Sequence, residues 1–268
     1  MQAGSSVASS KPEPRFQSLE ALPDEPPFGR ALLEELGVRG LHCGSAGILR
    51  LGPWINSDVM KLRVADGNAP ELGRLSRVDG RLYLRHDAMQ SFPFEDASFE
   101  WVYSEHFIEH FFPTEVVTWM TEMKRLLRPG GHMRISTPDL RKYVRGYLDP
   151  ANGFFAEHYN LLDHALGRFY TDDLGNAPPW GREFNERYCI DETEVPRRPG
   201  FMVNQIFQLW GHRWIYDPDE LRHVASAAGF PAEGMVECSF REGREHEVAR
   251  LDLPTRSDES LYFELERV

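Results

Sequence analysis

Two kinds of residue in the first half of the chain could bind a nucleoside. Gly44 and Gly47 follow a short apolar stretch, and glycine lets a backbone pass close to a ligand because it has no Cβ. Asp58 and Asp87 each end a later short run, where a carboxylate can accept hydrogen bonds from ribose hydroxyls. Alone, the glycines also fit an ordinary tight turn, and each acid fits a cap. Their ordered series predicts a nucleoside site.

These residues need a scaffold of alternating strands and helices. Residues 105–127 have helical apolar spacing, and a second helix is expected from Asp217, its N-cap, to Gly229, its stop. The alternation indicates an α/β fold, in which a mostly parallel seven-stranded sheet carries helices on both faces. The expected strands are 40–43, 54–58, 81–87, 99–104, 132–137, 234–240 and 260–265.

Composition divides the chain into four segments. Residues 1–28 are rich in Ser, Pro and Glu, which predicts a flexible leader. Residues 29–140 carry the alternation and form the expected ligand-binding core, and residues 216–268 complete its sheet. Residues 141–215 interrupt the alternation with a stretch that is both aromatic and polar. We expect this stretch to be an inserted, mainly helical lid or substrate insertion.

Residues 92–110, with the sequence FPFEDASFEWVYSEHFIEH, form the most specific stretch of the chain. They resemble the LPF-x-D-x-S-F-D-x-V-x-S-x-H-x-x-E-H run of class I S-adenosylmethionine-dependent methyltransferases of the type-11-like group. Residues 123–131 look like that family's helix and turn before its fifth strand. The similarity continues at 211–217, 228–230 and 259–264. The resemblance implies a Rossmann-like fold, methyltransferase activity and S-adenosyl-L-methionine as the cofactor.

The resemblance also implies which residues bind the cofactor. The glycine motif of the family falls on residues 41–46, but Ala46 replaces its second glycine. Gly44 and Asp58 lie so close in sequence that the first crossover helix must be short or absent. Both departures bear on cofactor affinity. The implied cofactor-binding residues are His42, Gly44, Ser45, Ala46, Asp58, Asp87, Ala88, Ser104 and Glu105.

Methyl transfer from a sulfonium mainly requires that a nucleophile be aligned with the methyl group, and a base only if the acceptor loses a proton. The motif places His106 near the reactive end of the cofactor, as a catalytic base or orienting group. Alternatively, His106 or His110 only hydrogen-bonds within the start of the helix. His158, His164 and His212 are rival bases. The expected substrate contacts are His110, Tyr159, His212 and Trp214, and this interpretation expects no metal ligand.

The net charge of −12 disfavours a nucleic-acid substrate, because binding to phosphates depends on clustered Lys and Arg. The three cysteines are widely spaced, and no apolar run reaches membrane-spanning length. The N-terminus lacks a signal-peptide pattern. We therefore expect a cytoplasmic protein without membrane partners. Its substrate is expected to be a hydroxyl or carboxyl group on a small molecule, natural product, sugar or peptide, and its oligomeric state is open.

Two other functions fit parts of the sequence. Residues 106–110 match H-x-x-E-H, a zinc-binding signature of one group of metallopeptidases, in which His106 and His110 hold zinc and Glu109 is the base. The second alternative is a non-catalytic, methyltransferase-like binding subunit. Ala46 and the shortened first crossover motivate it. Stoichiometric zinc would favour the first alternative, and tight partner binding without cofactor binding would favour the second.

Overall fold

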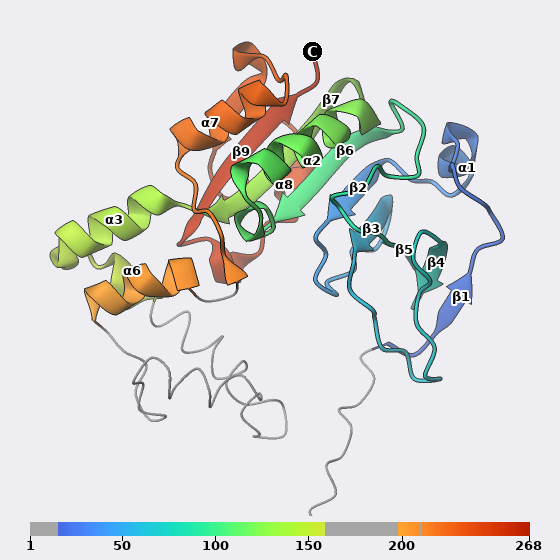
Figure 1. Ribbon diagram of the computed structural model, residues 1–268, viewed down its shortest axis with the longest axis horizontal. Helices are drawn as coiled ribbons and strands as arrows, with labels where there is room; N and C mark the ends of the chain where they lie inside the picture. Colours follow the sequence, from blue (N-terminus) through green and yellow to red (C-terminus); the bar gives the residue numbers. More distant parts are fainter. Residues whose placement is uncertain (1–15, 159–197, 209–210) are drawn as a thin grey trace, which may run out of the picture. The chain divides into compact units, whose positions relative to one another are not determined.

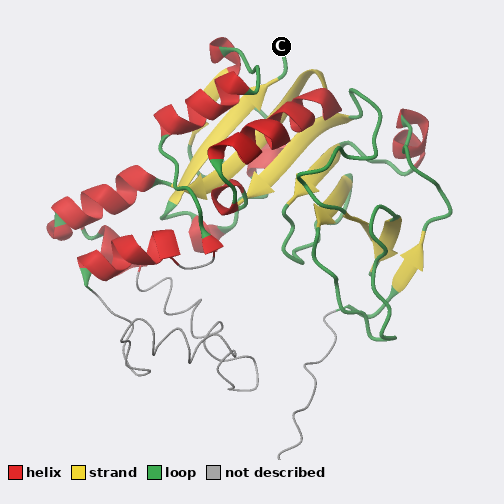
Figure 2. Cartoon of the chain, in the orientation of Figure 1, coloured by secondary structure: helices red, strands yellow, loops and turns green. Residues whose placement is uncertain are grey.

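The computed structural model describes residues 16–158, 198–208 and 211–268 (Figure 1). The chain divides into two compact units, Met1–Glu95 and Asp96–Val268. Each unit combines strands with helices, as the secondary-structure colouring shows (Figure 2). The protein is therefore of the expected α/β, Rossmann-like class, although its units divide within the predicted core segment of residues 29–140.

The first unit is built on five strands in the order β1-β4-β5-β3-β2. β2 and β3 are parallel, as are β3 and β5, whereas β4 is antiparallel to both β1 and β5. Every residue of β2 is buried, as are the first four of β3, which is typical of a parallel sheet covered on both faces. The elements are β1 (Leu19–Ala21), α1 (Arg30–Glu35), β2 (Gly40–Cys43), β3 (Trp54–Asp58), β4 (Leu75–Val78) and β5 (Arg81–Arg85).

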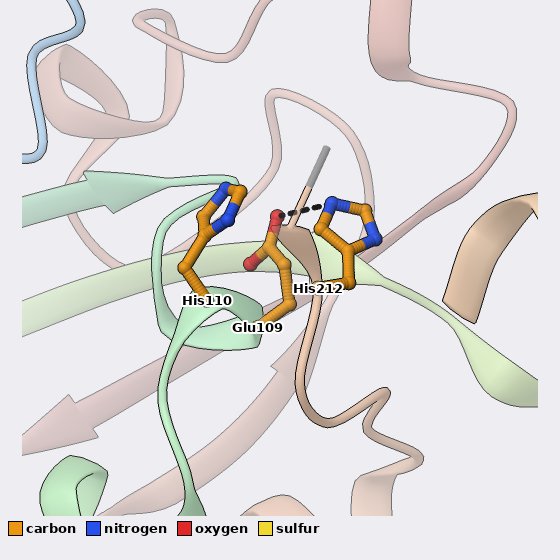
Figure 3. A group of neighbouring side chains, drawn as sticks. All are labelled: Glu109, His110 and His212. Atoms are coloured by element: carbon orange, nitrogen blue, oxygen red, sulfur yellow. Dashed lines mark ion pairs between the residues drawn. The ribbon is translucent and has the colours of Figure 1, made fainter. Parts of the chain in front are cut away.

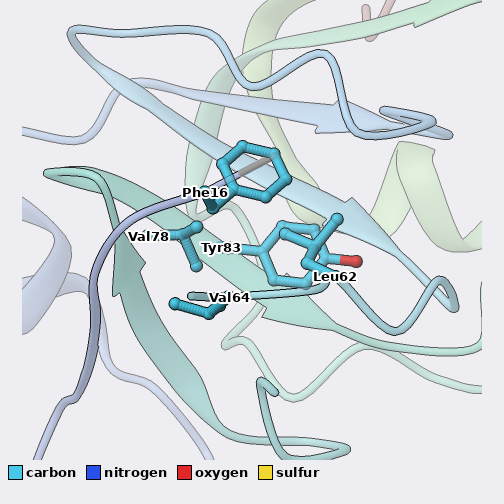
Figure 4. Close-up of a cluster of buried hydrophobic side chains, with 5 residues drawn as sticks. All are labelled: Phe16, Leu62, Val64, Val78 and Tyr83. Carbon is cyan, nitrogen blue, oxygen red and sulfur yellow. The ribbon is translucent and has the colours of Figure 1, made fainter. Parts of the chain in front are cut away.

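Residues 16–28 differ from the predicted leader. β1 pairs with β4, and Phe16 and Phe28 are buried at 7% and 1% exposure. Phe16 packs with Leu62, Val64, Val78 and Tyr83 in one apolar cluster (Figure 4). The few apolar side chains of this segment therefore anchor it, despite its polar composition. Residues 1–15 lie outside the described residues.

The connection from β2 to β3 contains no helix in residues 44–53, as the short spacing between Gly44 and Asp58 predicted. Gly47 and Gly52 both have positive φ, and Pro53 follows directly. Left-handed glycines and a proline break a helix, so the chain returns to the sheet by turns instead.

The second unit contains four strands in the order β6-β7-β9-β8. β6 is parallel to β7, and β9 runs antiparallel to both β7 and β8. Helix α2 joins β6 to β7 and packs beside α7 (Figure 1). The elements are β6 (Phe99–Glu105), η1 (Ile108–His110), α2 (Pro113–Leu126), β7 (Leu127–Pro138), α7 (Pro218–Ala227), η4 (Ala232–Gly234), β8 (Met235–Cys238), α8 (His246–Ala249), η5 (Pro254–Arg256) and β9 (Ser260–Glu266).

The helix predicted from Asp217 to Gly229 forms as α7, whereas the helix predicted over residues 105–127 begins only at Pro113, because β6 runs to Glu105 and residues 108–110 form a 3₁₀ turn. The buried side of α2 carries Val116, Met120 and Met123, in agreement with the apolar stripe. Asp217 caps α7 by accepting hydrogen bonds from the backbone N–H groups of residues 219 and 220, at 3.0 and 2.9 Å. Gly229 ends the helix with a φ of 85°.

All seven predicted strands are present among the described residues, and β1 and β4 are additional. Both additions are short and pair antiparallel with their neighbours. β9 also pairs antiparallel, so the strand pairing is mixed, with its parallel pairs at β2-β3, β3-β5 and β6-β7. The residues predicted to bind the cofactor lie at the ends of strands in these parallel pairs.

Arg134 forms a buried ionic cluster in the second unit. Its guanidinium group donates to both carboxylate oxygens of Asp252, at 2.9 and 2.6 Å, and to Glu264 Oε1 at 2.9 Å. All three side chains are at most 3% exposed. The cluster ties β7 and β9 to the loop at residue 252.

The described part of the predicted insertion is helical, with α3 (Leu140–Leu148), η2 (Pro150–Asn152) and α6 (Pro199–Gln208). Tyr143, Ile206 and Ile215 form a buried cluster, against which Phe154 and Phe155 pack. These aromatic residues therefore serve the core of the insertion. Residues 159–197 and 209–210, which include Tyr159 and His164, lie outside the described residues. None of the described helices is both long and apolar enough to cross a membrane.

Candidate functional site

The turn after β2 is bonded to the end of β3. The backbone N–H groups of Gly44 and Ser45 donate to the carbonyl of Ser57, at 3.0 and 3.1 Å. The N–H of Ala46 donates to Asp58 Oδ2 at 2.8 Å. The predicted glycine turn and the predicted acid are thus one structural unit.

Ala46 adopts the backbone conformation of a glycine. Its φ is 44°, and the nearby glycines Gly44 and Gly47 have similar positive φ values of 70° and 75°. This left-handed region is unfavourable for residues with a Cβ, but alanine carries the smallest one. The replacement of the family's second glycine therefore leaves the left-handed turn in place.

Asp58 also connects β3 to β5. Its Oδ1 accepts from the N–H of Met60 at 2.9 Å, and its backbone carbonyl accepts from the N–H of His86 at 2.9 Å. Asp87 follows directly, is exposed, and accepts from the N–H of Met89 at 3.0 Å. Hydrogen bonds therefore join residues 44–46 to the end of β3, and the end of β3 to His86, which Asp87 and Ala88 follow in sequence.

His42 and Asn56 form a buried polar pair beneath this turn. His42 Nδ1 lies 3.1 Å from Asn56 Oδ1, which also accepts from the N–H of Arg50 at 2.6 Å. The Asn56 amide donates to the carbonyls of Arg50 and Leu82, both at 3.0 Å. Burial lowers the pKa of His42 to about 4, so its ring is neutral at pH 7. The side chain of His42 thus supports the turn from within the sheet.

Ser104 and Glu105, the other predicted cofactor contacts, end β6 in the second unit. Ser104 is fully buried, and its hydroxyl has no hydrogen-bond partner among the described residues. Glu105 Oε1 accepts from the N–H of Leu253 at 2.8 Å, so this carboxylate fixes the loop before η5.

His106 follows β6 with a φ of 46°. Its side chain is 4% exposed, with Nε2 2.7 Å from Ser260 Oγ and Nδ1 3.4 Å from Glu109 Oε1. The Ser260 hydroxyl donates to the carbonyl of Arg256 at 2.6 Å, so it accepts from His106 Nε2–H. Burial lowers the pKa of His106 well below its usual value, and the nearby charge of Arg256 adds to this effect.

Glu109, His110 and His212 lie together beside His106 (Figure 3). The backbone carbonyl of Glu109 accepts from the N–H groups of Arg213 and Trp214, at 2.7 and 3.2 Å, which docks this segment on η1. Burial raises the pKa of Glu109 to about 8 and lowers that of His212 to about 4. At neutral pH burial therefore disfavours charge on the carboxyl group of Glu109 and on the rings of His106 and His212.

Sequence comparison finds relatives for the segment that includes most of the glycine turn and the strands from β3 to β7. Residues 45–135 match the family model described as a methyltransferase domain. A curated protein of Mycolicibacterium smegmatis, named "Probable S-adenosylmethionine-dependent methyltransferase", is 33% identical over 90 residues. Residues 45–135 are therefore similar to methyltransferase domains, and the curated relative is named as one of the S-adenosylmethionine-dependent type. The match to the curated relative spans 34% of this chain and 33% of that protein, so the chain aligns with about a third of its relative.

Solved methyltransferase structures are also similar to this chain. A SAM-dependent methyltransferase from Archaeoglobus fulgidus is 13% identical with a TM-score of 0.42, covering 88% of this chain and 92% of that one. An S-adenosylmethionine-dependent methyltransferase from Mesorhizobium loti is 17% identical with a TM-score of 0.41, covering 88% and 96%. Both TM-scores are low, so the likeness to methyltransferases depends on the sequence matches.

The turn after β2 and Asp58, both in the first unit, fit the cofactor that the resemblance implies. A carboxylate has about four acceptor positions, and the side chain of Asp58 uses one for Ala46 and one for Met60. Positions for ribose hydroxyls thus remain on an incompletely buried side chain. The left-handed turn at residues 44–47 presents backbone without bulky side chains.

Three of the four predicted substrate contacts lie among the described residues. His110 and His212 meet edge to face, with ring centroids 5.0 Å apart. Trp214 is 41% exposed and donates to Glu220 Oε1 at 3.1 Å. Tyr159 lies outside the described residues. The assigned roles of these residues, and of His106 as a base, stay predictions.

The H-x-x-E-H run does not form the helix that the peptidase interpretation requires. His106 ends a strand in a left-handed conformation, and only residues 108–110 form a single 3₁₀ turn. The side chain of Glu109 is fully buried, so its carboxyl group does not contact solvent. Sequence reasoning missed the proximity of Glu109 to His212. It also missed the buried hydrogen bonds of Asn56. The only signal for Asn56 is a polar residue in the middle of a short strand, directly after the apolar pair Trp54-Ile55.

Proposed function

We propose that the protein is an S-adenosylmethionine-dependent methyltransferase that acts on a hydroxyl or carboxyl oxygen of a small molecule, natural product, sugar or peptide. The observation that carries the proposal is the hydrogen bond from Ala46 N–H to Asp58 Oδ2. It joins the turn and the acid within the segment that matches the methyltransferase domain.

The residues at the ends of β2, β3 and β5 have separate roles in this proposal. The bound cofactor supplies an activated methyl group. Asp58 holds the ribose hydroxyls with its remaining acceptor positions. Asp87, exposed at the next strand end, orients the adenine amino group. The backbone of residues 44–46 provides the close approach that a bulkier turn would prevent.

The acceptor class is supported by charge and by the insertion. A net charge of −12 disfavours polyanionic acceptors such as nucleic acids. The insertion at 141–215 is rich in aromatic residues, which combine apolar faces with polar edges suited to small organic acceptors. A carboxyl acceptor is already ionised at pH 7 and needs no base, whereas a hydroxyl must lose its proton during the transfer.

Calorimetry with S-adenosylmethionine and S-adenosylhomocysteine tests the proposal. We expect micromolar binding by the wild type and a loss of about 1–3 kcal/mol in Asp58→Ala, since ribose hydrogen bonds are lost. Asp58→Asn keeps one oxygen for Ala46 N–H and should lose less. A labelled-methyl transfer assay against hydroxyl and carboxyl acceptors then identifies the acceptor class.

Asp66→Ala is the matched control. Asp66 Oδ1 accepts from the N–H of Asn68 at 2.8 Å, in a turn like that of Asp58 and Met60, but away from the strand ends. This variant should bind both ligands like the wild type. Equal binding by the wild type and Asp58→Ala would refute the role of Asp58, and no binding by the wild type would refute the proposed cofactor.

A further inference from the structure

Glu109 has an unsatisfied oxygen in the interior of the second unit. Its Oε2 accepts from the hydroxyl of Thr137 at 3.0 Å, whereas Oε1 has no hydrogen-bond partner among the described residues. The side chain is fully buried. A buried carboxyl oxygen without a hydrogen-bond partner is costly, so a partner other than the described side chains is expected at this oxygen.

The groups that face Glu109 Oε1 are acceptors. His212 Nδ1 lies 2.6 Å from the carbonyl of Ile206, which can only accept, so the hydrogen is on Nδ1 and the lone pair of neutral His212 is on Nε2. That Nε2 lies 4.0 Å from Glu109 Oε1. His106 donates Nε2–H to Ser260, which leaves its Nδ1 lone pair 3.4 Å from the same oxygen.

These distances do not fit direct hydrogen bonds. An imidazolium that donated to Glu109 would approach to about 2.7–2.9 Å, whereas the two ring nitrogens stay 3.4 and 4.0 Å away. The lone pairs of two neutral imidazoles therefore face one buried carboxyl oxygen, and no hydrogen bond among the described residues links them. This is the arrangement of ligands around a cation.

We propose that Glu109, His110 and His212 bind one divalent first-row transition-metal ion, of which Zn²⁺ is the type case. One ligand atom from each residue lies within 4.8 Å of the other two. Zinc bonds of 2.0–2.1 Å place tetrahedral ligands roughly 3.3 Å apart, so small side-chain rotations close the site. Two imidazoles and one carboxylate leave a further coordination position open.

The surroundings of the three residues are those of supported metal ligands. A metal-bound histidine usually donates its other N–H to a carbonyl or carboxylate, as His212 does to Ile206. Thr137 likewise orients Glu109 through Oε2. The charge of Arg256 reaches Glu109 and weakens the attraction for a cation, but Arg256 donates no hydrogen bond to Oε1.

The site has a structural consequence. The backbone N–H groups of Arg213 and Trp214 already dock on the carbonyl of Glu109. A metal held by residues on η1 and at position 212 cross-links the end of β6 to the segment before α7. Binding should therefore raise the melting temperature of the full chain, because a ligand of the folded state stabilises it.

The test is metal binding by the full chain after treatment with a chelator. We expect one Zn²⁺ or Co²⁺ per chain by elemental analysis, a visible Co²⁺ spectrum of low symmetry, and a higher melting temperature with metal. Glu109→Gln and His212→Ala should each weaken binding at least about 100-fold, since loss of outer partners alone costs 10- to 100-fold.

Glu109→Gln separates loss of metal from loss of fold. The amide of Gln can donate to His106 Nδ1 or His212 Nε2 while its oxygen still accepts from Thr137. The variant should therefore remain folded, with a melting temperature that no longer responds to metal. His223→Ala, which removes an exposed histidine of α7, should bind like the wild type.

Two results would overturn the site. One is a wild-type chain that takes up no metal above the level of Glu109→Gln. The other is equal loss of metal in His223→Ala and His212→Ala, which would indicate surface binding only. Neither measurement requires S-adenosylmethionine, so failure of the metal site leaves the proposed methyltransferase activity to its own test.

Discussion

The backbone N–H of Ala46 donates to Asp58 Oδ2 over 2.8 Å, and this bond joins the turn after β2 to the end of β3. The same residue holds a left-handed conformation with a φ of 44°. Position 46 therefore combines a steric constraint with a role in orienting the carboxylate assigned to the ribose.

The left-handed backbone at position 46 predicts how it tolerates substitution. Ala46→Gly should change the free energy of unfolding by at most about 1 kcal/mol, because relief of strain is offset by chain entropy. Ala46→Val should lose about 1–3 kcal/mol and weaken cofactor binding, since a β-branched residue is strained at this φ. Urea denaturation measures both changes. Ala65→Val, at an exposed position of the same unit, should be close to neutral.

The contact between Gly40 and Trp54 predicts a second effect. The two residues are paired across β2 and β3, and a Cβ at position 40 would overlap the Trp54 indole. Gly40→Ala should therefore lose about 1–3 kcal/mol of stability through overpacking. Combining it with Trp54→Leu should recover part of that loss. Gly200→Ala, where the added Cβ has open space, should cost nothing, and an equal cost at both glycines would contradict the contact.

Removal of Arg134 tests the buried ionic cluster. Arg134→Met leaves Asp252 and Glu264 buried without their partner and should cost about 3–5 kcal/mol of unfolding free energy. The matched variant is Arg128→Met, which breaks a 3.1 Å pair with Glu100 whose side chains are 35% and 32% exposed. It should cost at most about 1 kcal/mol. Chemical denaturation that gave equal losses would show that the cluster is not buried.

His158 predicts a dependence of stability on pH. Its Nδ1 lies 2.7 Å from Asp258 Oδ2, and its Nε2 lies 3.0 Å from the Tyr143 hydroxyl, which donates to Glu259 at 2.6 Å. Both ring nitrogens therefore act as donors, as in the charged form. Burial opposes that charge, but the bond to Asp258 and the charges of Glu259 and Asp258 raise the pKa of His158 above 6.5.

A raised pKa in the folded state stabilises the protein below the unfolded value of 6.5, and the stabilisation disappears as pH rises through the folded pKa. The wild type should lose unfolding free energy across that range, relative to His158→Gln. The exposed His223→Gln variant should follow the wild type. Parallel pH profiles for the wild type and His158→Gln would rule out a charged His158.

Sequence patterns predicted the elements that are long or strongly apolar. The strand at 99–104 and the stripe of α2 follow directly from burial of one face or both. β1 and β4 were missed because their short sequences, LEA and LSRV, are interrupted by polar residues. The leader prediction failed for residues 16–28, because the burial of Phe16 and Phe28 depends on partners distant in sequence.

The same limit applies to the candidate sites. The glycine turn and Asp58 were predictable, because consecutive parallel strands place their ends at one edge. The approach of His212 to Glu109 was not, since about a hundred residues separate them and backbone bonds from positions 213 and 214 create the contact. The H-x-x-E-H spacing suggested a metal, but with His106 as a ligand in place of His212.

The most direct test of the cofactor site is a crystal structure with saturating S-adenosylhomocysteine. The ribose should hydrogen-bond to Asp58, with the nucleoside against residues 44–46 and the adenine beside Asp87. A nucleoside bound elsewhere, or strand ends of β2, β3 and β5 without ligand at saturation, would contradict the methyltransferase site described for this chain.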